Sequence, residues 1–326
     1  MAITTLGDVA RSNVATLEGK SRDVAGVVFR LAVAATLYIS VLIVVILVMD
    51  VVTDGWDQLS SRLGGFLSGT LRSRSIDDQL GVHQGLYGSF WVAAFVAIIA
   101  FPTGVASAVY LEEYARRNRV TNFIELAIRN LSGVPSVVYG LLGLFLFVEG
   151  NTIFGFIGLD WIVNITGGSS PISAGLTLAI LVLPIVIITA QEAIRAVPSG
   201  LKEGAYGVGA TKSEMIRTQV LPYAAPGILT GTLLSMSRAI GEAAPLLLIG
   251  AISGGLTANP SFLDVTALQD RFTALPILIV KWVSERGRDE GFATAAAAAI
   301  VVLLAVVLAL NMTAILLRNR FENKRG

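Results

Sequence analysis

The chain has 326 residues, of which 54% are hydrophobic and only 14% are charged. An average soluble domain carries about 25% charged residues, so this composition argues against a water-soluble fold, and the net charge of +1 argues against a protein that binds nucleic acid electrostatically. The chain has no cysteine, which excludes disulfides, thiolate metal sites and cysteine nucleophiles, and its single histidine, His83, cannot form a metal cluster alone.

Six segments are long and apolar enough to cross a bilayer, which requires about 20 mostly apolar residues. They are Phe29–Met49, Leu86–Val109, Phe123–Val148, Ile172–Ala190, Pro226–Ile252 and Phe292–Leu317. The first exceeds the apolar core of a signal peptide, about 7–15 residues, and follows a long polar tail, so we interpret it as a retained span. The sequence therefore predicts an all-α integral membrane protein with six transmembrane helices.

The distribution of Lys and Arg predicts the orientation of these spans. Fifteen of the 24 basic residues fall in the N-terminal stretch through Arg30, the C-terminal tail, and the second and fourth connections; seven fall in the other three connections, and Arg129 and Arg238 lie deeper within spans. Both termini are therefore predicted to be cytoplasmic. The predicted organisation is a cytoplasmic tail (1–28), a first transmembrane helix (29–49), an extracytoplasmic loop (50–85), a five-helix core (86–317) with a cytoplasmic loop (197–225), and a second tail (318–326).

Two segments suggest departures from simple spanning helices. In the third span, "NLSGVPSVVYG" places Gly133 and Pro135 where they should break or kink the helix and free backbone polar groups. Such a break is tolerated where protein or a cavity satisfies those groups, so a lining of a pathway and a plain packing kink both remain open. The segment Phe272–Ser284 is too short to span and reads as an interfacial helix or as re-entrant packing.

The cytoplasmic loop 197–225 is polar but strongly patterned. Small residues cluster between Gly204 and Ala210, and Thr211 can cap a short helix with Glu214 as its capping-box partner. Leu221-Pro222 is then expected to stop that helix before Pro226 opens the next span. The pattern predicts a helix, a glycine turn and a second helix, whose small side chains suit docking into a groove of another protein. At the inner end of the fourth span, just before this loop, Glu192 and Arg195 are expected to form a solvated interfacial pair.

The fifth span contains an unusual charged pair in "SMSRAIGEAAPLLLIGAI". Arg238 lies near the middle of the predicted span, where a charge costs about 2.5–3.5 kcal/mol on insertion scales and should face protein or water. Glu242, four residues later, can pair with it on one helix face. One reading is a buried ion pair that fixes helix register. The other is a guanidinium that meets a passing oxyanion, with Glu242 neutralising it when the path is empty and preventing tight trapping.

No catalytic constellation is recognisable in the sequence. "VATLEGKS" ends like a phosphate-binding P-loop, but the required glycine is replaced by Val14. A single histidine provides no set of nucleophile, base and orienting group. Energy for uphill transport would therefore come from a partner or from an ion gradient.

The cytoplasmic loop resembles the signature of ABC-importer permeases, which is Glu-Ala-Ala, three residues, Gly, nine residues, Ile, one residue and Leu-Pro. The chain carries the matching residues Glu203, Ala205, Gly209, Leu221 and Pro222. It departs at Gly204, where the signature has alanine, and at Gln219, where it has isoleucine. The resemblance implies a type I permease fold in which this segment is the ATPase-coupling loop.

Further stretches resemble the PstA subunit of phosphate ABC importers, over roughly residues 86–317. They are "LSGVPSVVYGLLGL", "EAIRAVP", "EGAYGVGATK" and "SRAIGEAAPLLL". The resemblance implies a multi-pass protein of the cell membrane that pairs with a PstC-type permease, two PstB-type ATPase subunits and a PstS-type phosphate-binding protein. It also implies that Arg238 and Glu242 line the substrate pathway, and that ATP and Mg²⁺ are used by the partner ATPase, with no cofactor bound to this chain.

Three alternatives stay open. The chain could be the PstC-type subunit, which shares much of the pattern, or a permease for another oxyanion such as sulfate or molybdate. From another class, it could be an ion-coupled secondary transporter that uses the Arg238–Glu242 pair alone. The glycine-rich loop argues against this last alternative, because a secondary transporter has no ATPase to dock.

Overall fold

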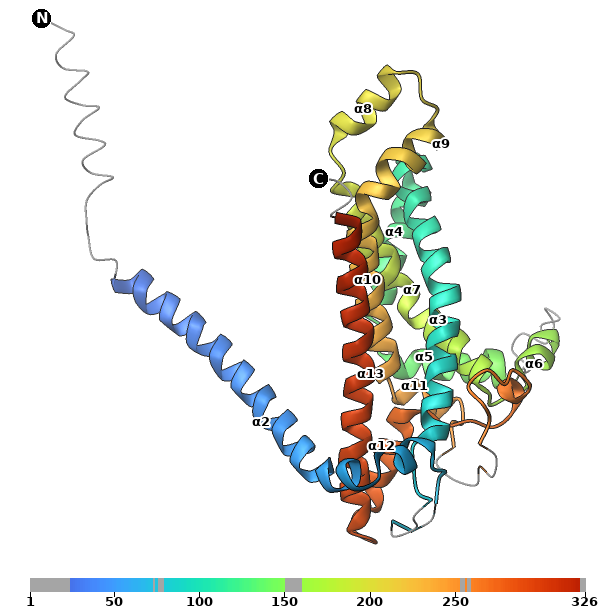
Figure 1. Cartoon of the computed structure of the whole chain (residues 1–326). Coiled ribbons are helices and arrows are strands. Elements are labelled where there is room, and N and C mark those ends of the chain that lie inside the picture. Colours follow the sequence, from blue (N-terminus) through green and yellow to red (C-terminus); the bar gives the residue numbers. More distant parts are fainter. Residues whose placement is uncertain are drawn as a thin grey trace, which may run out of the picture. The chain divides into compact units, whose positions relative to one another are not determined.

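The computed structural model describes residues 24–72, 74–75, 79–149, 160–252, 256 and 259–322, and the chain divides into two compact units, residues 1–50 and 51–326. In the described part the regular elements are helices, with one isolated bridge between Thr70 and Leu80 (Figure 1). The beginning of the predicted N-terminal tail, including the "GKS" stretch, and the last four residues lie outside the described residues.

The first predicted span is part of a much longer helix, α2 (Val24–Ser68). Its side chains over residues 24–50 are almost all exposed, as expected for a segment that faces lipid or a partner. The helix continues beyond the first predicted span into the predicted extracytoplasmic loop, 50–85, as far as Ser68, although Arg62 departs from helical geometry. Packing within the second unit explains the extension: Gly55 lies against the backbone of Ala298, and Phe66 is fully buried.

In its described residues, the second unit continues with a series of helices that include the π turns η1, η2 and η4. In order they are α3 (His83–Val109), η1 (Tyr110–Tyr114), α4 (Arg119–Ser132), α5 (Ser136–Gly143), η2 (Leu144–Val148), α6 (Asp160–Thr166), α7 (Pro171–Arg195), α8 (Ser199–Gly207), α9 (Lys212–Met215), η4 (Ile216–Val220), α10 (Leu221–Gly241), α11 (Ala244–Leu248), η5 (Thr266–Gln269), α12 (Leu275–Glu285) and α13 (Gly291–Glu322). Of these, α3, α7, α10 and α13 lie side by side in Figure 1.

The relative directions of the long helices follow from their contacts. In α3, Gly104 lies against Val186 of α7, and Glu112, just beyond α3, pairs with Arg195 at the end of α7. The two helices therefore run parallel and end together near α8 and α9, at what we call the α8–α9 end. The opposite end carries α12, since the backbone of Leu275 donates to the Ser89 hydroxyl near the start of α3.

Helix α10 runs antiparallel to α7 through close contacts between small residues. Added Cβ atoms at Gly227 and Gly231 would lie 2.8 Å from the Ala193 side chain and 2.5 Å from that of Thr189. Glycine is thus needed at these positions for the helices to approach so closely.

The pair α4 and α5 is bent by 101° at the predicted break, which confirms that Gly133 and Pro135 interrupt the third segment. Glu125 of α4 lines a cavity with Arg195 at the α8–α9 end. The carbonyl of Phe147, in η2, accepts a hydrogen bond from Ser173 near the start of α7. The bent pair therefore connects the two ends of the second unit, as it must because α3 and α7 are parallel.

Among the residues that the structure describes, four helical segments could cross a membrane by length and composition, or five if the bent pair counts as one span. The four are Val24–Ser68, His83–Tyr114, Pro171–Arg195 and Gly291–Arg320. The predicted fifth span, Pro226–Ile252, is not one helix: α10 ends at Gly241 and the short α11 follows. Pro245 contributes to the interruption, because it has no N–H to donate to the carbonyl of Gly241 and so cannot continue the backbone ladder of α10.

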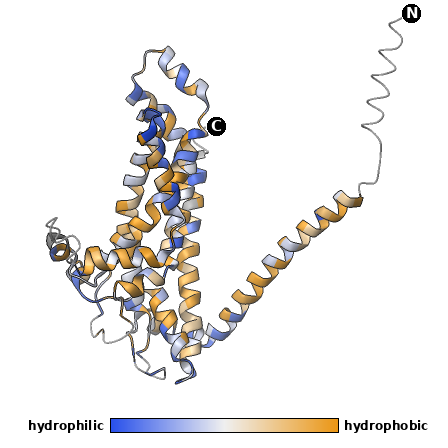
Figure 2. Cartoon of the chain, turned by 180° about the vertical axis from the view of Figure 1, so that it is seen from behind, coloured by the Kyte–Doolittle hydropathy of each residue, from blue (hydrophilic) through white to orange (hydrophobic). Residues whose placement is uncertain are grey.

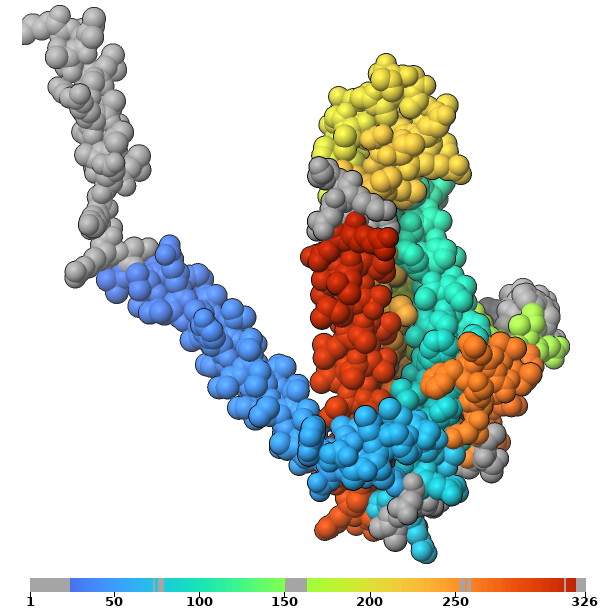
Figure 3. Space-filling model, in the orientation of Figure 1, coloured from blue at the N-terminus to red at the C-terminus, as the bar shows by residue number. Residues whose placement is uncertain are grey.

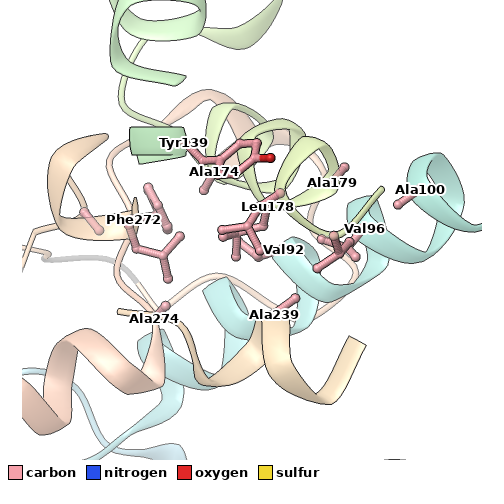
Figure 4. Packing of buried hydrophobic residues seen from close by; sticks show 14 of the residues in the cluster. Val92, Val96, Ala100, Tyr139, Ala174, Leu178, Ala179, Ala239, Phe272 and Ala274 are labelled. Atoms are coloured by element: carbon pink, nitrogen blue, oxygen red, sulfur yellow. The ribbon is translucent and has the colours of Figure 1, made fainter. Parts of the chain in front are cut away.

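The described residues of the second unit form three hydrophobic clusters. The central cluster joins α3, α5, α7 and α10 through residues that include Val92, Tyr139, Leu178 and Ala239 (Figure 4). A second lies at the α12 end and a third under α8 and α9. Helix α12 packs into the second cluster through side chains such as Trp282, so the segment Phe272–Ser284 is packed against other helices. Figure 2 shows hydrophobic residues along the long helices and hydrophilic ones gathered at the α8–α9 end.

Candidate functional site

The predicted contact between Arg238 and Glu242 is present. The Nε atom of Arg238 lies 3.3 Å from Oε1 of Glu242. Arg238 belongs to the last turn of α10, where a cation is favoured by the helix dipole, whereas Glu242 is the C-cap residue with an extended backbone. The pair therefore lies at a helix end. The sequence had suggested a position inside a continuous helix.

The guanidinium of Arg238 is only partly used by this contact. Its side chain is 52% exposed and that of Glu242 is 18% exposed. Within the described residues, the two terminal nitrogens of Arg238 have no hydrogen-bond partner. Two parallel N–H groups in a planar fork are suited to a tetrahedral oxyanion, and the neighbouring carboxylate limits how tightly that anion is held.

The two helix breaks meet in the central cluster. Val134, inside the first break, and Ala243, just after the end of α10, both pack against this cluster. The Tyr139 hydroxyl donates to the carbonyl of Leu131 at 2.8 Å and so satisfies one backbone group near the first break. The structure therefore brings the break at Gly133 and Pro135 into the same packed region as the segment that carries Arg238 and Glu242.

A polar contact beside Arg238 was not predicted. The hydroxyl of Ser237 donates to Oδ1 of Asn311 at 2.6 Å, which links α10 to α13. An asparagine in the otherwise apolar last span was the signal that the sequence offered, but nothing local indicates its partner. This hydrogen bond fixes α13 next to the residue that precedes Arg238.

The predicted coupling loop, residues 197–225, contains the expected pair of helices. Helices α8 and α9 form a projection at one end of the second unit, coloured yellow in Figure 3. Gly209 has a φ of +86° in the turn between them, a conformation that favours glycine. Glu203 is exposed in α8, and a Cβ at Gly204 or Gly209 would meet nothing within 4 Å. This surface is therefore left open by the chain itself.

The predicted capping box is confirmed. The Thr211 hydroxyl accepts from the backbone N–H of Glu214, while the Glu214 carboxylate accepts from the backbone and the hydroxyl of Thr211 at 2.8 and 2.7 Å. These hydrogen bonds, first that of the side chain and then that of the backbone, lower the pKa of Glu214 below its ordinary value.

The predicted helix stop at Leu221 and Pro222 is wrong. The π turn η4 leads directly into α10, whose first residue Leu221 has helical geometry, and Pro226 lies inside α10 rather than opening it. A proline is tolerated in the first turn of a helix because its missing N–H is not needed there. The preceding π turn changes the backbone hydrogen-bond pattern from i→i+4 to i→i+5 just before Pro222. The projection is thus joined to α10 without a flexible joint.

The expected pair of Glu192 with Arg195 is replaced by a tertiary contact. Nη2 of Arg195 lies 2.5 Å from Oε1 of Glu112, which also accepts from Nε2 of Gln191 at 2.9 Å. The partner comes from η1, more than 80 residues earlier in the chain, so sequence spacing could not indicate it.

The sequence is similar to those of known transport proteins. Residues 100–321 match the family described as "binding-protein-dependent transport system inner membrane component". The chain is 35% identical to the probable ABC transporter permease YqgI of Bacillus subtilis over 64% of this chain and 63% of that protein. It is 34% identical to the phosphate transport system permease PstA 1 of Mycobacterium tuberculosis, over 73% and 70%, and 30% identical to PstC 2 of Mycobacterium bovis, over 68% and 72%. The chain thus spans slightly less than two thirds of YqgI.

Among solved structures, the fold is similar to that of a chain in a bacterial alginate ABC transporter crystallised with an alginate-bound periplasmic protein. The TM-score is 0.62 at 14% identity, over 90% of this chain and 94% of that one. At this identity the likeness concerns the fold alone.

Proposed function

The chain belongs to the family of binding-protein-dependent transport system inner membrane components, and on that premise we propose that it is the PstA-type permease subunit of an ATP-driven importer of inorganic phosphate. As a member of this family it is a multi-pass permease component of the inner membrane and is not itself an enzyme. Relatives named as phosphate permeases support phosphate as the transported anion.

The observation that carries this proposal is the position of Arg238. Its charged group is half exposed on a face of α10 that it shares with the exposed Leu234, four residues earlier. An apolar side chain and a cation on one uncovered face suit neither water alone nor lipid alone. They suit an interface with a second permease subunit around a narrow polar path, in which Arg238 would meet the phosphate.

The proposed assembly contains a PstC-type permease, two PstB-type ATPase subunits that use ATP and Mg²⁺, and a PstS-type phosphate-binding protein. The open glycine surface of the coupling loop would receive the ATPase. Six spans, with both termini in the cytoplasm, place that loop on the ATPase side. ATP-driven closure of the ATPase dimer would move α8 and α9, and the rigid junction with α10 would carry this motion toward Arg238.

The test is transport by the reconstituted complex. Proteoliposomes containing this chain, the sister permease and the ATPase, with the binding protein supplied, should take up labelled phosphate only when ATP is present on the coupling-loop side. Excess unlabelled phosphate should compete, whereas sulfate and molybdate should not. Preferential competition by sulfate or molybdate would assign the permease to that anion instead.

The PstC-type alternative is supported by the similarity to PstC 2, which is weaker than that to PstA 1. Co-expression decides between the two. A PstA-type chain should assemble with a PstC-type partner and not replace it. Transport by the isolated chain on an ion gradient would exclude both subunit assignments and indicate a secondary transporter.

A further inference from the structure

The π turn η1, at the end of α3, holds the coupling loop with three consecutive side chains. Glu112 pairs with Arg195, at the end of α7. Glu113 pairs with a lysine of α8, and the Tyr114 ring lies under a lysine of α9. Each of the three residues thus contacts a different helix, and together they connect α3 to both sides of the loop.

The central contact joins Glu113 to Lys202. Oε1 of Glu113 lies 2.6 Å from Nζ of Lys202, and the side chains are 7% and 27% exposed. A carboxylate this buried is unfavourable without a partner, so loss of the lysine would leave an uncompensated charge. The contact on α9 is looser, since Nζ of Lys212 is 5.1 Å from the centre of an exposed ring. Glu113 therefore provides the firmest of the polar links between η1 and the two loop helices.

The two helices of the coupling loop depend on η1 to different degrees. From α9 and η4, Met215, Ile216 and Val220 are buried in the hydrophobic cluster under the loop. Helix α8 has no buried residue, and only Ala205 packs partly against that cluster. Besides its contacts with α9 and η4, α8 is therefore held to the end of α3 by the pair between Lys202 and Glu113.

The geometry of η1 suits this role. The turn closes with a hydrogen bond from the backbone N–H of Ala115 to the carbonyl of Tyr110, at 2.8 Å, and Ala115 then turns into extended backbone. A π turn inserts an extra residue into a helix and so changes the direction of the side chains within it. Inside this turn, Glu112 reaches α7 and Glu113 reaches α8.

We propose that Glu113 is a positioning residue that locks α8 onto α3, so that a movement imposed on α8 is passed to α3 and from there to the central cluster. This proposal rests on the proposed function, because it assumes that a partner moves α8. The physical route is contiguous: Val92 and Val96 of α3 pack in the same cluster as Ala239, the residue after Arg238. Spatial continuity alone does not demonstrate coupling, so the proposal needs a coupling measurement.

The first experiment requires no transport. Amide hydrogen exchange is measured on the complete chain in nanodiscs, with Glu113→Gln compared with the original chain. Faster exchange of α8 amides and unchanged exchange in η4 are expected. Glu290→Gln, which removes an exposed carboxylate at the α12 end, is the matched control. Unchanged exchange in α8 would overturn the proposal, whatever the chain transports.

The second experiment uses the reconstituted complex with its ATPase. For Glu113→Gln, phosphate uptake per ATP hydrolysed should fall about tenfold, within the range over which coupled sites typically affect each other, while the ATPase still co-purifies. The double variant Glu113→Lys with Lys202→Glu should recover most of the coupling. A ratio for Glu113→Gln within twofold of the original complex would refute the role of Glu113. A complete absence of ATP-dependent uptake by the original complex would refute the proposed function instead, and the exchange result would still decide whether Glu113 positions α8.

Discussion

At the scale of single residues, Arg238 combines two properties that conflict in a membrane. Its charge is costly at membrane depth, yet half of its side chain is not covered by this chain. The helix dipole at the end of α10 and the carboxylate of Glu242 reduce this cost. Glu242 contacts only the Nε atom, so the two terminal nitrogens of the guanidinium can still donate hydrogen bonds. In the proposed pathway, this arrangement would bind an anion weakly and release it.

Replacement of Arg238 by Gln should therefore remove transport without disrupting assembly. Loss of a charged hydrogen-bond donor is typically worth about 1.5–3 kcal/mol, so we expect uptake to fall about 10- to 100-fold. Arg238→Lys, which keeps the charge but not the planar fork, should give an intermediate value. Initial rates of labelled phosphate uptake measure the effect, and the yield of ATPase that co-purifies serves as the control. Normal uptake by Arg238→Gln would contradict its place in the path.

Gly88 tests a packing constraint at the α12 end. A Cβ at this position would collide with the backbone carbonyl of Thr273, which cannot rotate away. Overpacking of this kind costs about 1–3 kcal/mol, so Gly88→Ala should lower the melting temperature of the purified chain. Gly204→Ala is the control, because a Cβ there meets nothing and alanine favours the helix. Equal melting temperatures for the two variants would show that the approach of α3 to Thr273 is looser than described.

The contacts of the candidate site differ in how far apart their residues lie in the sequence. The Arg238–Glu242 pair and the capping box at Thr211 depend on spacings of four and three residues, so the sequence predicted both. The partner of Arg195 lies on another helix, and the hydrogen bond from Ser237 to Asn311 joins the fifth and last predicted spans. Such contacts depend on how the helices pack, which no local pattern contains.

At the scale of elements, hydropathy predicted where helices lie better than where they end. The break at Gly133 and Pro135 was predicted because both residues act through their own backbone. Helix α2 continues into a polar stretch because Gly55 and Phe66 find packing partners there. The sequence did not predict that the helix continues from η4 into α10 through Pro222, because this continuation depends on the π turn before it.

The capping box predicts a pH dependence of α9. Hydrogen bonds from Thr211 lower the pKa of the Glu214 carboxyl in the folded loop, so this contribution to stability is fully present above the ordinary glutamate pKa of about 4.3. It is lost as the pH falls below that value and through the lowered folded pKa. A spin label on Ser213→Cys should therefore become more mobile below about pH 4. Thr211→Ala should show this mobility already at neutral pH, and equal mobility of both chains at every pH would argue against the cap.

At the scale of the whole molecule, the described part of the chain leaves much apolar surface uncovered. Nearly all side chains of α2 over residues 24–50 are exposed, and α4 has no buried residue. Lipid and partner subunits must cover these faces, since soluble monomers rarely expose large apolar patches. Six spans remain a prediction, because length and composition identify four spanning segments, or five with the bent pair, and α10 is not among them.

The absence of cysteine makes this topology directly measurable, because each introduced cysteine is the only thiol in the chain. Ala25, Ser213, Gly287 and Asn319 are exposed positions for single Cys substitutions. An even number of crossings places Ala25 and Asn319 on the same side, and the positive-inside pattern makes it the side of Ser213. A membrane-impermeant maleimide should therefore label Gly287→Cys in right-side-out vesicles and the other three variants only in inverted ones. Labelling of Ala25→Cys together with Gly287→Cys would show that α2 does not cross the membrane. Labelling of Asn319→Cys together with Gly287→Cys would show that α13 does not return to the side of the coupling loop, and either result would reject six spans.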